Sequence, residues 1–286
     1  MTKRSTHTRM PYLRTIRYAS PVVAWHDIVL TEAAPAWSRA YRADSPRLLV
    51  PGSRWIEVEK QGRRFVCDAL SPLQLTPEVP YRMRQPFEGQ RSVLLVFDVA
   101  DVAVAARPRL GLAAHWALAR WRAALDTGVF DRLAFEEDVV ALWPPATTDA
   151  QHLCGEASAR ARRAVERARE RLADDPASNA PLHELAHDAA YSPFQLARTF
   201  RQVNGVGLHG YRTRLRMVLA LARLAQGEDD LTQLALELGY SSHSHFSAAF
   251  RAHVGTTPSA ARRGLRAPST TGTGAARASS AGAGIR

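Results

Sequence analysis

The residues with the most distinctive chemistry in this sequence lie in one short segment, His183-Glu184-Leu185-Ala186-His187. On a helix, two histidines four positions apart face the same side, and a glutamate between them is the arrangement of zinc-dependent hydrolases. The extended form of this motif needs a glycine and a third histidine where this chain has Ala190 and Pro193. The form of the motif whose third zinc ligand is acidic is not matched either, because no Asp or Glu lies between Asp188 and Glu228. We therefore predict no metal and no cofactor here, with a zinc hydrolase as the alternative.

Two further patterns carry weaker chemical signals. Residues 205–210 read G-x-G-x-x-G, but a dinucleotide site needs a preceding strand. This segment follows a predicted helix, so its glycines are expected to end one helix and start the next. A cupin-type enzyme, the other alternative, would need a clustered His-x-His with a glutamate and a further histidine. The first half offers only His26, with His115 in a later predicted helix, whereas His243 and His245 diverge by about 200° on a helix.

Composition indicates a soluble chain with a basic second half. The chain has 286 residues, 46% of them hydrophobic, and a net charge of +11. No run of about 18 apolar residues predicts a membrane span, and the basic start lacks the apolar core of a signal peptide. With Cys67 and Cys154 as its two cysteines, the chain is expected in the reducing cytoplasm. Residues 156–286 contain 18 arginines against 11 acidic residues, which suggests a polyanionic partner.

The segments that must position these residues change character along the chain. Short apolar runs separated by Gly and Pro turns predict strands at 22–30, 48–50, 55–59, 65–70, 73–76 and 93–99. Their spacing favours a small β-barrel or sandwich. Helical periodicity predicts helices over 113–125 and 135–143. The proline-rich segment 144–148 marks a domain boundary, after which the chain is predicted to be helical to Arg263 and disordered over 264–286.

The second half contains an internal repeat. Leu182-His183-Glu184-Leu185-Ala186 recurs 49 residues later as Leu231-Thr232-Gln233-Leu234-Ala235, and Tyr191-Ser192 recurs as Tyr240-Ser241. After one inserted residue, Leu196-x3-Phe200-x4-Gly205 recurs as Phe246-x3-Phe250-x4-Gly255. Each copy predicts a short helix, a tight turn and a second helix, which is the helix-turn-helix layout. The copies span about 182–205 and 231–255. A long amphipathic helix over 208–225 joins them, with one apolar side.

Helical angles identify the outward side chains of each second helix. In the first copy, Leu196, Phe200 and Val203 fall within about 60° of one another and face the core. The opposite positions are Phe194, Arg198 and Arg201. In the second copy Phe246 and Phe250 face inward, and the matching outward positions are Ser244, Ala248 and Arg251. Such a helix suits the DNA major groove, because arginine can bind guanine O6 and N7 as a forked pair. The alternative is an ordinary helical domain with a solvated polar face. It explains a single copy of the pattern well, but it does not explain two copies at matched spacing.

A family pattern runs through this half in the order Leu185-Ala186, Ser192, Leu196-x-Arg198-x-Phe200, Gly205, Tyr211, Arg216-x3-Ala220, Leu234-Ala235, Gly239-Tyr240, Phe246-x3-Phe250 and Gly255-Thr256-Thr257-Pro258. On these residues, 160–263 resembles the DNA-binding domain of AraC/XylS-type transcriptional regulators. The resemblance implies two helix-turn-helix units that enter successive major grooves on one face of the duplex. Arg198 matches the family's usual arginine, whereas Ala248 stands where the second unit often carries one. Base contacts of the second unit would come from His243, Ser244 and Ser247, or the second unit mainly binds phosphate through Arg251.

The first half resembles, more loosely, the cupin-like sensing barrel of many such regulators. We therefore predict an α+β protein with a small N-terminal β-barrel followed by helices, over 1–145, as a sensing or dimerisation domain. An all-α DNA-binding domain with two helix-turn-helices occupies 151–263. The predicted partners are double-stranded DNA, a small-molecule effector, RNA polymerase and a second copy of the chain, with no membrane and no catalysis. The predicted DNA-binding residues are Phe194, Gln195, Arg198, Arg201, His243, Ser244, Ser247 and Arg251.

Overall fold

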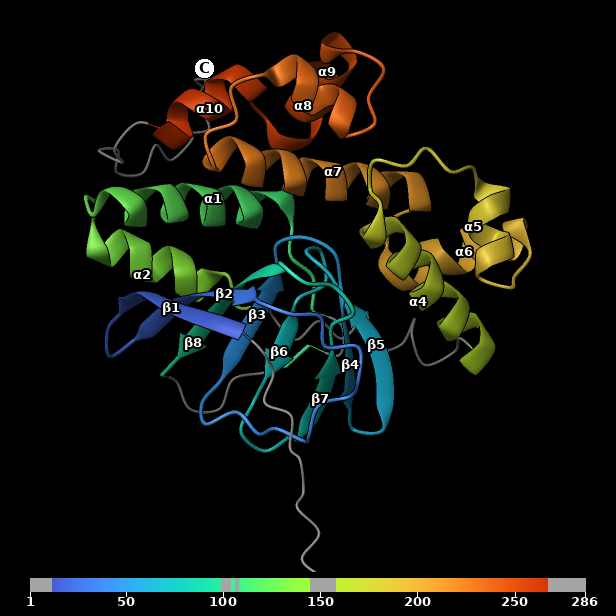
Figure 1. Ribbon diagram of the computed structural model, residues 1–286, viewed down its shortest axis with the longest axis horizontal. Coiled ribbons are helices and arrows are strands. Elements are labelled where there is room, and N and C mark those ends of the chain that lie inside the picture. Colours follow the sequence, from blue (N-terminus) through green and yellow to red (C-terminus); the bar gives the residue numbers. More distant parts are fainter. Residues whose placement is uncertain (1–11, 99–103, 106–107, 145–157, 267–286) are drawn as a thin grey trace, which may run out of the picture.

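The computed structural model describes residues 12–98, 104–105, 108–144 and 158–266 (Figure 1). The fold is α+β, with the strands in the first half of the chain. The strands are β1 (Tyr12–Ala19), β2 (Val23–Leu30), β3 (Arg47–Pro51), β4 (Ile56–Lys60), β5 (Arg63–Cys67), β6 (Leu73–Leu75), β7 (Tyr81–Arg84) and β8 (Arg91–Phe97). The helices are α1 (Leu112–Thr127), α2 (Arg132–Ala141), α4 (Ala159–Asp174), α5 (Leu182–Asp188), α6 (Pro193–Asn204), α7 (Leu208–Ala225), α8 (Leu231–Glu237), α9 (His243–Val254) and α10 (Pro258–Arg266).

The strands form two sheets that face each other. One sheet has the order β1-β2-β8-β3-β6 and the other the order β5-β4-β7. The predicted closed barrel is therefore corrected to two separate sheets, because the three-residue β6 ends the first sheet without pairing to a described strand of the second. The space between the sheets is filled by side chains from both. They include Ile28, Leu49, Ile56, Val58, Phe65, Leu73, Leu75, Tyr81, Met83 and Leu94.

The opposite face of the five-stranded sheet is covered by α1 and α2 (Figure 1). The strand register places Trp25 and Leu48 on either side of Leu95, so these residues form one row across the sheet. Trp121 of α1 and Phe135 of α2 pack in the same core. The first half thus has three layers, two of sheet and one of helix.

In the second half, α7 lies between two groups of helices. One core contains residues of α4, α5, α6 and the first half of α7, and another contains α8, α9, α10 and the second half of α7. The sequence predicts a single apolar side for this helix. The structure instead buries it on several sides, since Leu215 and Val218 belong to the first core and Met217 and Leu221 to the second.

The two halves of the chain also pack on each other. Helix α1 runs along α7 (Figure 1), and Ala119 of α1 belongs to the core of α8–α10. Ala69 and Leu70, which follow β5, belong to the core of α4–α6. The predicted boundary near 145–151 lies outside the described residues, as does the predicted tail beyond Arg266. Within the described part of the chain, no helix is long and apolar enough to cross a membrane.

The C-terminal helix extends beyond the predicted end of the helical domain at Arg263. Helix α10 continues to Arg266, three residues into the segment predicted to be disordered. Leu265 is 5% exposed in the core of α7–α10, and the Arg266 guanidinium donates to the Gly227 carbonyl at 2.8 Å. These two contacts are the reason why the helix extends.

Several exposed apolar side chains belong to β1, to α2 and to the turn before α2. They include Leu13, Ile16, Val129, Leu133 and Val140. Helix α2 contacts the end of β1, where the Tyr18 hydroxyl donates to Glu136 and the Tyr18 ring packs edge-on against Phe135. Ile16 pairs with His26, which pairs with Leu94 of the core between the sheets, so Ile16 lies on the face of the sheet opposite α2. Strand β1 is also an edge strand, so one row of its backbone groups faces away from the sheet.

Candidate nucleic-acid interface

Helix α6 is held by a cap at its start and by a buried stripe along its length. The Ser192 hydroxyl accepts a hydrogen bond from the Gln195 backbone N–H at 3.3 Å, and Pro193 occupies the first turn. The predicted inward residues are buried: Leu196, Phe200 and Val203. Because the buried stripe fixes the rotation of the helix, the opposite side must face outward.

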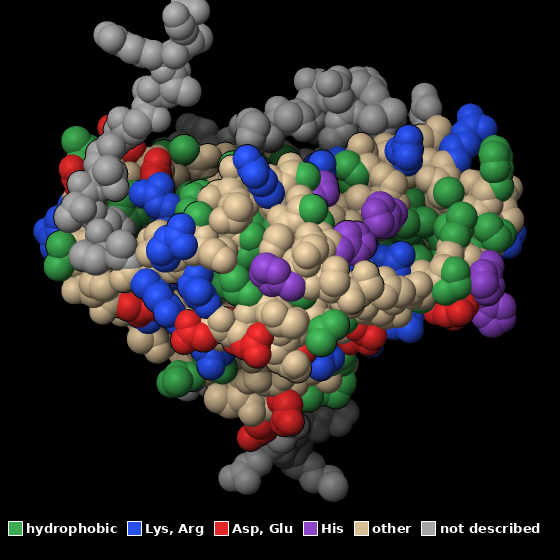
Figure 2. Space-filling model, turned by 90° about the horizontal axis from the view of Figure 1, so that it is seen from above, with side chains coloured by type: hydrophobic (Ala, Val, Ile, Leu, Met, Phe, Trp, Pro, Cys, Tyr) green, Lys and Arg blue, Asp and Glu red, His purple; other side chains and the backbone are tan. Residues whose placement is uncertain are grey.

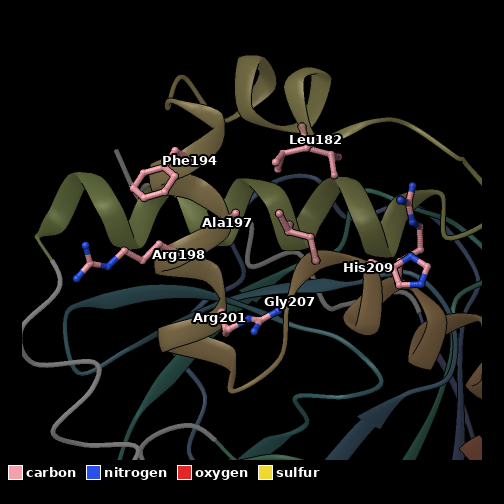
Figure 3. A pocket seen from close by; sticks show the side chains of 10 residues that line it. Leu182, Phe194, Ala197, Arg198, Arg201, Gly207 and His209 are labelled. Atoms are coloured by element: carbon pink, nitrogen blue, oxygen red, sulfur yellow. The ribbon is translucent and has the colours of Figure 1, made fainter.

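The outward side of α6 carries the predicted first-copy residues. Phe194 and Arg198 extend from the same side of the helix (Figure 3), and Phe194 is 76% exposed. Arg198 is exposed and forms no hydrogen bond or ion pair with any described residue. The Arg201 guanidinium lies against Gly207, where a Cβ would be 3.4 Å from its Nη2. Gln195 is exposed, with its Oε1 accepting from the Ser192 hydroxyl at 2.9 Å. Arg201 is exposed as well, so both arginines of α6 are accessible to another molecule.

An open groove of about 520 Å³ lies between α5, α6 and the start of α7 (Figure 3). Its lining combines apolar and basic side chains. The lining residues include Leu182, Leu185, Phe194, Leu208, Arg198, Arg201, His209 and Arg212. The basic groups attract phosphate, and the apolar ones provide contact area.

Helix α9 has the same construction with different outward chemistry. The Ser242 hydroxyl accepts a hydrogen bond from the His245 backbone N–H at 3.1 Å, so Ser242 caps the start of the helix. Phe246 and Phe250 are fully buried. The outward positions are Ser244, Ala248 and Arg251, all exposed. The half-buried His243 and Ser247 lie 3.3 Å apart between Nε2 and Oγ, so part of their hydrogen-bonding capacity is used within the helix.

The turns before α6 and α9 have the same backbone geometry. The Tyr191 N–H donates to the Ala186 carbonyl at 2.9 Å, and the Tyr240 N–H donates to the Ala235 carbonyl at 3.0 Å. The residue before each tyrosine has a positive φ, +51° at Ala190 and +78° at Gly239. Since these residues stand 49 positions apart, as in the sequence repeat, the repeat is also a structural repeat.

Comparisons with known proteins agree with this geometry. A family model described as a helix-turn-helix domain matches residues 185–264. A Streptomyces lividans protein described as an AraC-like transcription regulator is 38% identical over 84 residues, 29% of this chain and 28% of that protein. The regulatory protein SoxS of Escherichia coli K12 is 36% identical over 81 residues, 28% of this chain and 76% of SoxS. This chain belongs to the AraC/XylS-type transcriptional regulators.

The family model matches within the helical half of the chain, at residues 185–264. The alignment covers only about 28% of the length of the S. lividans relative. A solved AraC-type structure from Chromobacterium violaceum is 27% identical, covers 39% of this chain and 99% of its own, and has a TM-score of 0.36.

Histidine and arginine side chains are interspersed on the face formed by the C-terminal helices, which Figure 2 shows from above. His253, near the end of α9, is exposed. Partial burial lowers the pKa of His253, and the neighbouring positive charge of Arg214 and His209 on α7 lowers it further. The lowered pKa favours the neutral form of His253.

The His183-Glu184-x-x-His187 segment lies on α5 with both histidines exposed. Leu185 and Ala186 of the same helix are 3% and 1% exposed in the core, as the repeat predicts. The described residues contain no group of three or more His, Cys, Asp or Glu side chains placed to hold a metal ion. In the G-x-G-x-x-G segment, Gly205 has a φ of +68° and ends α6, and Gly207 precedes α7, so these glycines separate two helices.

Three buried or bridging arginines were not predicted from the sequence as functional residues. Arg109, from the segment before α1, donates to the carbonyls of Val203 and Asn204 at the end of α6. Arg169 on α4 and Arg216 on α7 are 2% and 6% exposed. The available sequence signal for Arg216 is that both of its neighbours in the chain, Leu215 and Met217, are apolar. The abundance of arginine along the chain hides that signal.

Proposed function

We propose that this chain is a sequence-specific DNA-binding regulator of transcription. The observation that carries the proposal is the structural repeat, in which α6 and α9 follow matching turns and each presents an exposed polar side. Arg198 supports it most directly, because an exposed arginine with no hydrogen-bond or ion-pair partner among the described residues is available to a polyanion. Membership of the AraC/XylS-type family supports the same function.

The outward residues of the two helices have different proposed roles. Arg198 would bind the O6 and N7 atoms of a guanine, and Phe194 beside it would contact a thymine methyl group. Gln195 and Arg201 would add polar and phosphate contacts. On α9, Ser244 and the His243–Ser247 pair offer weaker base contacts, and Arg251 would bind phosphate. The first unit thus supplies most of the sequence preference.

We assign the two halves of the chain to separate tasks. Residues 151–263 would form the DNA-binding domain, and residues 1–145 would sense a small molecule and form a homodimer. Leu133 and Val140, seven positions apart and so on one side of α2, are exposed apolar side chains that support a second copy as the partner of this helix. Contacts of α1 with α7 and of Arg109 with the end of α6 provide a physical connection from the first half to both units.

Selection of bound duplexes from a random pool tests the proposed function. We expect the full-length protein to enrich two short half-sites, their centres about one helical turn or 10–10.5 base pairs apart. Binding to the enriched duplex should weaken steeply with salt, since phosphate contacts release counterions. Equal binding to the selected and scrambled duplexes at every salt concentration would show that the protein is not a sequence-specific regulator.

A further inference from the structure

Arg216 connects the two helix-turn-helix units through a single buried guanidinium. It lies in the middle of α7, and its residue is 6% exposed. Towards the first unit, its Nε donates to the Pro176 carbonyl at 2.7 Å and its Nη2 to the Ala177 carbonyl at 3.0 Å. Towards the second unit, its Nη1 lies 3.4 Å from the Gly239 carbonyl oxygen. The guanidinium therefore joins the loop before α5 to the turn before α9.

Other contacts at the same place bring the two backbones together. A Cβ on Gly239 would lie 2.0 Å from the Ala177 carbonyl oxygen, so only glycine fits this approach. The Asn179 side-chain amide donates to the Gly239 carbonyl at 3.1 Å, and its Oδ1 accepts from Arg216 Nη2 at 3.0 Å. The Arg216 guanidinium also lies 5.2 Å from the ring centroid of Tyr240.

This geometry uses the specific shape of arginine. A guanidinium is planar and has five N–H donors, so it can bond to carbonyls on two sides at once. A lysine ammonium would reach one group of acceptors but would not span both. Because the bonds are made to backbone atoms of the loop and the turn, they fix the position of one unit relative to the other.

Relative position matters for binding because DNA is a regular helix. Changing the distance between two half-sites by one base pair moves the second by about 3.4 Å and rotates it by about 34°. We propose that Arg216 is a positioning residue that sets the separation of α6 and α9 and thereby selects the spacing of the half-sites. The proposal rests on the proposed DNA-binding function.

The test is a spacing series on selected DNA. Duplexes carry both half-sites at the preferred spacing or with one or two base pairs added or removed, and one further duplex carries the first half-site alone. For the unaltered protein, we expect a one-base-pair change to weaken binding about tenfold, or about 1.4 kcal/mol. For Arg216→Met this penalty should fall below about threefold, while affinity for the single half-site stays within about twofold, because α6 itself is unchanged.

Arg223→Met is the matched control. Arg223 also lies on α7, but its guanidinium binds Glu228 in the turn after α7 at 2.7 Å and Glu237 of α8 at 3.0 Å, so neither bond reaches the first unit. This variant should keep the tenfold spacing penalty of the unaltered protein, about 1.4 kcal/mol. A lost penalty in Arg223→Met as well would show that general loosening of α7, not the bridge, sets the spacing, and would overturn the inference.

A second variant covers the case in which Arg216→Met does not fold. Asn179 is exposed, and Asn179→Ala removes its bonds to Gly239 and Arg216. Asn179→Ala should also reduce the spacing penalty, but by a smaller factor than Arg216→Met. If Arg216→Met folds, an unchanged spacing penalty in this variant would overturn the inference. If Arg216→Met does not fold, an unchanged spacing penalty in Asn179→Ala would overturn it. If the unaltered protein shows no sequence preference at all, the proposed function fails instead, and the inference with it.

Discussion

Arg169 and Asp68, 101 positions apart in the sequence, form an ion pair between the two halves of the chain, with 3.0 Å between Nη2 and Oδ2. Both side chains are almost fully buried, at 3% and 0% exposure. The Tyr211 hydroxyl donates to the same Asp68 oxygen at 2.6 Å. Glu166 accepts from Arg169 at 3.2 Å and from the Val66 backbone N–H at 3.0 Å. Residues of β5, α4 and α7 therefore share one buried polar network.

Removing one partner of this pair should strongly destabilise the protein. Asp68→Ala leaves the Arg169 charge buried without its main counter-charge, so we expect a loss of about 3–5 kcal/mol in the free energy of unfolding. The double variant Asp68→Ala/Arg169→Met should lose less than the sum of the single changes. Urea unfolding at pH 7 measures both. Arg54→Ala, which breaks the exposed pair of Arg54 with Asp174 at 3.2 Å, should cost about 0–1 kcal/mol. Equal losses in Asp68→Ala and Arg54→Ala would contradict this prediction.

Glu170 on α4 gives the contact between the halves a pH dependence. Partial burial and, to a lesser degree, the neighbouring carboxylates of Glu57 and Glu166 together raise the pKa of Glu170 to about 7, against the opposing charges of Arg84 and Arg167. Because this pKa lies above that of an unfolded glutamate, the protein loses stability as the pH rises from about 4.5 through 7.

Glu170→Gln should therefore stabilise the protein at pH 8 and have little effect at pH 5. After allowance for solvent screening of a half-buried group, we expect a gain of about 1 kcal/mol at pH 8. Urea unfolding of both proteins at the two pH values measures the difference. Glu184→Gln on the exposed side of α5 serves as the control and should show no such dependence. A Glu170→Gln effect of the same size at pH 5 and pH 8 would argue against this origin.

The two reading helices should respond differently to substitution. Arg198→Ala should cost about 1–3 kcal/mol on the selected duplex and relax the preference at one base pair. Arg251→Ala should weaken binding to all sequences alike and reduce the salt slope by about one unit. Ser244→Ala should have less effect than Arg198→Ala, since one hydroxyl cannot form a forked pair. Binding to duplex variants at two salt concentrations separates these cases. A uniform loss from Arg198→Ala would mean that Arg198 contacts phosphate.

A fragment that begins at Gln151 should fold into helices and retain some DNA binding. The fragment keeps the packing of α7 against α4–α6 and α8–α10, although it loses α1, which also packs along α7. It should be less stable than the full chain, because Ala69, Leu70 and Ala119 no longer cover its two cores. Circular dichroism and binding to the selected duplex provide the measurements. An unfolded fragment beside a stable full-length protein would mean that the proposed domain boundary is wrong.

The sequence predicts the second half better than the first, for physical reasons. The repeat fixes both the turns and the buried stripes, so Phe200 and Phe250 could be placed in the core from their spacing alone. Strand β1 was not predicted because most of its side chains face solvent and show no apolar alternation. Strand β7 is short and contains two arginines. The contacts of Arg169 and Arg216 depend on segments that are distant in the sequence, so local patterns do not reveal them.

The filled interior between the two sheets would limit the rate at which a small molecule can bind there. A small molecule that binds there must wait until side chains such as Phe65, Tyr81 and Met83 have moved apart. Its observed association rate would then level off as its concentration rises, at the rate with which the sheets open, instead of increasing in proportion. A response to such a molecule would be delayed by that opening step, so substitutions that shrink these side chains would make the response faster.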